Sequence, residues 1–123
     1  MIVPIHTNKE LIFKQYLTII NGVLSSEKKL TAIEIDVLEK MLYVDYLYRH
    51  LPKEKRDKII FHKTTRQKIR EEVYGISIQS LNNILTKLRK KGMIEGNSLK
   101  VKVPLKEDKI ELTFKLEIKK DGE

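Results

Sequence analysis

GISIQSLNNILTKLRKKGMI, residues 75–94, is the stretch that decides the fold, since it holds one complete helix between two glycines. Ser77 has the short oxygen-bearing side chain that caps a helix N-terminus, and Gly92 is a typical residue to follow a helix end. The apolar residues recur at helical spacing and share one side: Leu81, Ile84, Leu85 and Leu88. We therefore predict a helix over residues 78–91 that packs this side inward.

A shorter helix is predicted just upstream of this stretch. Thr64 or Thr65 can cap it, and it runs to about Tyr74 before Gly75 ends it in a left-handed conformation. Two short helices joined by a tight turn are typical of a helix-turn-helix. The charged segment before them, residues 52–63, contains one apolar triplet, Ile59 to Phe61, which we interpret as a small strand at the domain edge.

Two capping boxes predict two helices in the first half of the chain. Thr7 and Glu10 open a helix over residues 8–24, and Thr31 and Glu34 open one that runs to about Leu51, before Pro52. The second helix has two apolar stripes and must therefore be covered on two sides. The first helix is one possible cover, and a second subunit, paired through residues 8–51 in a homodimer, is the other.

The C-terminal part alternates apolar and polar residues, which predicts two half-buried strands over residues 98–103 and 110–119. Residues 104–109 form the predicted loop of this hairpin. The expected fold class is therefore α+β, mainly α with a C-terminal β-hairpin. We treat residues 1–123 as one domain: a winged helix-turn-helix over residues 30–119, preceded by an extra N-terminal helix.

Residues 75–94 resemble the recognition-helix segment of bacterial and phage winged-helix regulators. The likeness consists of the small residue and serine before the helix, the spacing of its apolar residues, and the Lys-Lys-Gly-hydrophobic ending that leads into the wing. The segment from Leu30 to Leu38 is similar to the opening helix of the MarR-like group. This resemblance implies a DNA-binding winged helix-turn-helix over about residues 30–119.

The net charge of +8 is concentrated in one third of the chain. Residues 53–91 carry twelve lysines and arginines against four acidic residues, whereas residues 1–52 and 92–123 are each neutral. A local excess of this kind is typical of a surface that binds a polyanion, although a solvated charged face has the same composition.

The helix over residues 78–91 combines amides, hydroxyls and lysines on its predicted outer side, with no acidic residue. Glutamine and asparagine can pair with adenine in the major groove, and lysine can bind phosphate. The upstream helix and the hairpin add further donors for phosphate. The predicted DNA-binding residues are Thr64, Thr65, Arg66, Lys68, Ser77, Gln79, Ser80, Asn82, Asn83, Thr86, Lys87, Lys90, Lys91, Lys100 and Lys102.

The sequence has no motif that indicates catalysis, and we expect neither an enzyme nor a cofactor. His6, His50 and His62 lack zinc-site spacing, so no metal is expected. The absence of cysteine fits a cytoplasmic protein of a bacterial cell or a phage-infected host. No apolar run approaches the ~20 residues of a membrane span, and the N-terminus lacks the features of a signal peptide.

Two functions agree with these patterns. The first is a sequence-preferring double-stranded DNA-binding protein, a transcriptional regulator or a replication accessory. The second is a winged-helix protein-interaction module, for example a phage packaging or virion component, because one fold serves many functions.

Overall fold

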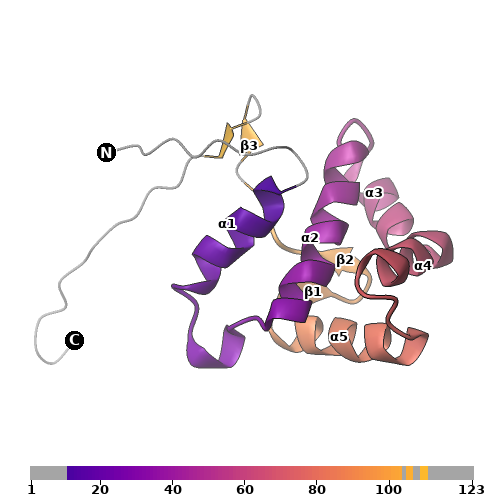
Figure 1. Cartoon of the computed structure of the whole chain (residues 1–123). Coiled ribbons are helices and arrows are strands. Elements are labelled where there is room, and N and C mark those ends of the chain that lie inside the picture. The colour runs from indigo at the N-terminus through magenta and orange to yellow at the C-terminus, as the bar shows by residue number, and fades with distance from the viewer. Residues whose placement is uncertain (1–10, 104, 107–108, 111–123) are drawn as a thin grey trace, which may run out of the picture.

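The computed structural model describes residues 11–103, 105–106 and 109–110 of the chain. Over these residues the protein is mostly helical with short antiparallel hairpins, which confirms the α+β class (Figure 1). The helices are α1 (Ile12–Asn21), a 3-10 turn (Ser26–Lys28), α2 (Ala32–Leu47), α3 (Lys53–Ile60), α4 (Lys63–Glu72) and α5 (Ile78–Lys90). The strands are β1 (Ile94–Glu95), β2 (Ser98–Leu99), β3 (Leu105–Lys106) and β4 (Lys109–Ile110).

Helix α2 is the centre of the fold and contacts α1, α3, α4 and α5. The predicted capping box is present: the Glu34 amide donates to Thr31 Oγ1 (3.3 Å), and the Thr31 amide donates to Glu34 Oε1 (2.9 Å). The helix ends at Leu47 rather than near Leu51. The next residues form tight turns, in which the Arg49 amide donates to the Tyr46 carbonyl (3.2 Å) and the Leu51 amide to the Tyr48 carbonyl (2.9 Å).

Helix α1 covers one side of α2, so the cover that the two apolar stripes require comes from within the chain. Phe13 and Leu17 are buried, and the Phe13 ring lies 6.4 Å from that of Tyr43 and 5.9 Å from that of Tyr46. Helix α1 ends at Asn21 rather than at the predicted residue 24. Its predicted capping box, Thr7 and Glu10, lies outside the described residues.

The strand predicted at Ile59 to Phe61 is wrong, because these residues end α3 or follow it. Ion pairs one turn apart, Lys53 with Asp57 and Lys58 with Glu54, accompany the helical conformation. Asp57 and Ile60 are buried on one side of this helix. Ile59 and Ile60 therefore form the end of a helix whose other residues are all charged, and Phe61 is its C-cap.

Helices α4 and α5 form the predicted pair around a tight turn. His62, rather than Thr64 or Thr65, caps α4, since its Nδ1 accepts from the Thr64 amide (3.1 Å). In the turn, Tyr74 and Gly75 both have positive φ, 58° and 62°, and Arg70 Nε donates to the carbonyl of Ile76 (2.9 Å). A glycine adopts this conformation without strain, whereas a tyrosine does so rarely.

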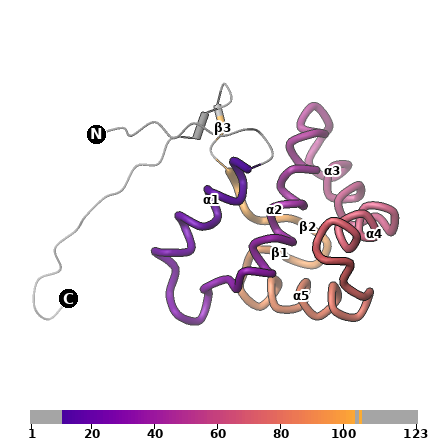
Figure 2. The backbone as a smooth tube through the Cα atoms, in the orientation of Figure 1, coloured from indigo at the N-terminus to yellow at the C-terminus, as the bar shows by residue number. Residues whose placement is uncertain are grey.

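Helix α5 agrees with its prediction to within one residue. Ser77 is the cap, and its Oγ accepts from the Ser80 amide (3.0 Å). The predicted inward residues are all buried: Leu81, Ile84, Leu85 and Leu88. Figure 2 shows α5 at one edge of the backbone path. The residues on the side of α5 opposite these leucines and Ile84 are exposed.

The hairpin differs from its prediction. Ser98–Leu99 pairs with Ile94–Glu95 across a two-residue turn, and residues 100–103 form no strand. Gly96 has φ 60° at the first central position of this turn, where such hairpins favour glycine. Leu105 pairs with Ile110, the first residue of the second predicted strand, in a second short hairpin that occupies the predicted loop. Residues 111–119 lie outside the described part of the chain.

Side chains of α3 close the outer edge of β2. Asp57 accepts from the Leu99 amide (3.2 Å) and the Ser98 hydroxyl (2.8 Å), and Lys53 Nζ donates to the Leu99 carbonyl (2.7 Å). Lys53 also donates to Asp57 (2.7 Å). Burial would raise the pKa of Asp57, but these hydrogen bonds outweigh it and hold the pKa below its usual value. A helix thus satisfies the backbone groups that a third strand would otherwise bind.

Candidate nucleic-acid interface

The outer side of α5 carries polar side chains that are all exposed. We call this surface the reading face; it consists of Gln79, Asn82, Asn83, Thr86, Lys87 and Lys90. The amides lie in the first half of the helix and the lysines in the second half. Within the described residues, the amide groups of Gln79, Asn82 and Asn83 have no hydrogen-bond partner, so their donors and acceptors remain available to a ligand.

The hydroxyl groups of α5 are less available than its amides. Thr86 Oγ1 donates to the Asn82 carbonyl (2.9 Å), so its proton is already used within the helix. Ser77 and Ser80 form the N-terminal cap, where the Ser77 hydroxyl donates to Ser80 Oγ (3.0 Å). These three predicted site residues lie beside the amides, but two of the three hydroxyl protons are engaged inside the protein.

Lys91 lies away from the reading face. Its Nζ binds Oε1 of Glu34 in the capping box of α2, and the side chains are 17% and 1% exposed. Burial would raise the pKa of Glu34, but Lys91 and Thr31 together lower it below its usual value. Lys91 therefore joins the end of α5 to the start of α2, and we leave it out of the candidate interface.

Arg89 has a role that sequence reasoning missed. Its Nε donates to the Gly96 carbonyl (2.9 Å) and its Nη2 to Asn97 Oδ1 (3.2 Å), so it binds the turn between β1 and β2. The sequence offered one signal for this role: Arg89 stands near the end of the helix, and a Gly-Asn turn, Gly96-Asn97, follows a few residues later. The guanidinium fixes the hairpin against α5.

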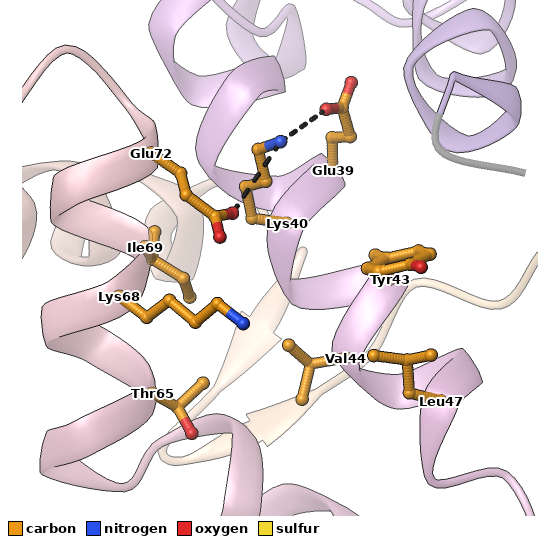
Figure 3. Close-up of a pocket in the computed structure, with 9 residues that line it drawn as sticks. All are labelled: Glu39, Lys40, Tyr43, Val44, Leu47, Thr65, Lys68, Ile69 and Glu72. Carbon is orange, nitrogen blue, oxygen red and sulfur yellow. Dashed lines mark ion pairs between the residues drawn. The ribbon is translucent and has the colours of Figure 1, made fainter.

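The predicted residues of α4 divide between two sides of the helix. Thr65 and Lys68 line a groove of about 360 Å³ between α4 and α2, and Lys68 reaches across it toward Val44 (Figure 3). Thr64 is exposed near the N-terminus of α4. Arg66 is partly buried, and its Nε has no hydrogen-bond partner among the described residues.

Three of the four charged residues that line the groove pair among themselves. Lys40 lies between Glu39 (3.6 Å) and Glu72 (3.8 Å), as the dashed lines of Figure 3 show. Burial raises the pKa of Glu39 above its usual value, although Lys40 and Lys14 act against the shift. Lys68 and Thr65 therefore belong to the groove more than to the reading face.

The hairpin side adds little positive charge. Lys100 pairs with Glu95 (3.5 Å), while Lys102 is exposed and its carbonyl accepts from the Tyr16 hydroxyl (3.2 Å). Both lysines lie beyond the short turn rather than at it. Of the predicted hairpin contacts, only the Lys102 side chain has no acidic partner within the part of the chain that the structure describes.

The described residues contain no cluster of three or more acidic or histidine side chains that could hold a metal ion. None of the helices among them is long and apolar enough to cross a bilayer. No protein-family model matches the chain, and no curated protein or solved structure matches it significantly.

Proposed function

We propose that this protein binds double-stranded DNA with sequence preference and inserts the reading face of α5 into the major groove. The observation that carries the proposal is the composition of this exposed face: amides first, lysines last, and no carboxylate. The major groove admits one helix, and the N-terminal half of a recognition helix contacts base edges. The lysines in the second half are then placed to bind phosphate.

Arg66 supports the proposal from α4. Thr64 is exposed in the first turn of α4 and offers a hydroxyl donor to a phosphate oxygen. Arg66, two residues later, is partly buried; its Nε is closed to solvent, so its contribution to DNA binding is the positive charge of the guanidinium. We therefore assign Arg66 and Thr64 to the DNA backbone and Gln79, Asn82 and Asn83 to the bases.

A salt series tests this proposal. The affinity for duplex DNA should fall linearly in log salt, by about 0.9 log units per neutralised phosphate. Lys90→Gln should lower this slope by about one unit, whereas Lys55→Gln, at an exposed position of α3, should leave it unchanged. Binding that is undetectable at low salt, or that does not depend on salt, would exclude the proposed function.

A regulator and a replication accessory both fit this binding mode. The protein-interaction module is the second candidate, and the same acid-free face supports it, because that face would equally meet an acidic protein surface. Duplex DNA at low salt separates the two, since the interaction module predicts no saturable binding to it.

A further inference from the structure

An isoleucine stands at the edge of the reading face. Ile78 is the first residue of α5 and 61% exposed, next to Gln79 and one turn before Asn82. Single exposed apolar residues are common on protein surfaces, so exposure alone indicates nothing. The position is informative, because Ile78 shares the N-terminal half of α5 with all three amides of the reading face.

The amides and Ile78 match the two bases of an A·T pair. In the major groove, adenine presents the N7 acceptor and N6 donor that Gln or Asn can bind in pairs, and thymine presents a 5-methyl group. Thr86 adds to the apolar part, because its hydroxyl proton is bound to the Asn82 carbonyl and its methyl group remains.

Guanine lacks a comparable partner in this half of the helix. The usual readers of guanine are arginine and lysine, which bind O6 and N7. Arg89, the arginine of α5, already donates to Gly96 and Asn97 in the hairpin turn. The two lysines of the reading face lie in the last turns, after the amides.

From these three observations we propose that the reading face selects A·T base pairs: its amides bind adenine and Ile78 packs on a thymine methyl group. The inference rests on the proposed function and names its target class. A surface of amides and methyl groups gains little from a G·C pair, whose major-groove edge has no methyl group.

Replacement of thymine by uracil tests the methyl contact directly, because it removes only the 5-methyl group. A site is first enriched from a random duplex library with the full-length protein, and each thymine in it is then replaced in turn. One replacement should weaken binding about fourfold, which corresponds to one buried methyl group. Replacement of the bound adenine by 7-deazaadenine should also weaken binding, because it removes the N7 acceptor.

Two variants assign the contact to its residue. Ile78→Ala should bind the thymine and uracil duplexes equally, whereas Val23→Ala should keep the fourfold difference, because Val23 is similarly exposed (69%) but follows α1. A G·C-rich consensus, or equal affinity of the unmodified protein for every thymine and uracil duplex, overturns the inference and leaves DNA binding intact. Absence of saturable duplex binding overturns the proposed function itself.

Discussion

Neighbouring lysines at the end of α5 have different environments. Lys87 and Lys90 are exposed on the reading face, whereas Lys91 is bound to the buried carboxylate of Glu34. Helical spacing distinguishes an inward position from an outward one, but it cannot tell which lysine meets an acid from a helix 57 residues away in sequence. Sequence alone therefore predicted which side of α5 is exposed, but not the pairing of Lys91 with Glu34.

The Lys91 pair predicts a stability effect. Lys91→Met should lower the free energy of unfolding by about 3 kcal/mol, because it leaves the Glu34 carboxylate buried without its cation. Urea denaturation at pH 7 measures the change. Lys90→Met is the matched control and should leave the stability unchanged, and equal effects of the two substitutions would contradict the assignment.

The reading face predicts different binding defects for substitutions of its amides and of its lysines. Asn83→Ala should cost about 1–3 kcal/mol on an enriched site and relax the preference at one base pair. Lys90→Ala should weaken binding to all sequences alike. Titrations of specific and random duplexes measure both effects.

A core variant provides the comparison for these two. Leu85→Ala should lose binding only by unfolding, at a cost of about 2–5 kcal/mol in stability, since Leu85 is buried. If a folded Asn83→Ala protein keeps both its affinity and its sequence preference, α5 does not read bases.

At the scale of elements, the sequence predicted features that depend on residues close together in the chain, such as helix caps. It did not predict features that depend on distant residues, such as strand pairing. The capping box at Thr31 and the N-terminal cap at Ser77 each join residues three apart in the sequence, and both are present. The alternation of residues 98–103 indicates extended chain but does not specify a partner, and the nearest segment across Gly96 paired with Ser98–Leu99. Helix α3 was missed because its charged residues are held by tertiary contacts rather than by a clear apolar stripe.

The contacts of Asp57 predict how the hairpin responds to pH. Because its pKa is lower in the folded protein, its contribution to stability is present above the unfolded value of about 3.9 and is lost as pH falls through the folded pKa. Asp57→Asn should cost about 2 kcal/mol at pH 7. The substituted protein should also lose less stability than the parent below pH 4.

Urea denaturation between pH 2 and pH 7 checks this prediction. Glu54→Gln is the control, because Glu54 forms an exposed pair with Lys58 and should change neither the stability nor its pH dependence. A parallel loss of stability on acidification in the parent and in Asp57→Asn would show that Asp57 does not carry the acid response.

At the scale of the whole molecule, the sequence left two candidates to cover the apolar stripes of α2: α1 and a second subunit. The structure shows α1 in this place. Phe13 and Leu17 of α1 pack on α2, so the apolar stripes no longer require a second subunit. We therefore expect a monomer at tens of micromolar in sedimentation velocity. A dimer would mean that apolar residues still exposed near α1, Ile19 and Val23, pair between copies, and it would suit DNA half-sites about 34 Å apart.

The closed edge of β2 has a consequence for the protein at high concentration. An open strand edge is a template on which another molecule can add a strand, and the first additions lead to fibres. Lys53 and Asp57 occupy both backbone groups of Leu99, so at this residue an incoming chain finds no donor or acceptor. The α3 side chains that hold the hairpin thus also protect β2 from intermolecular β-pairing, and loss of either would leave a backbone group of Leu99 open to an incoming chain.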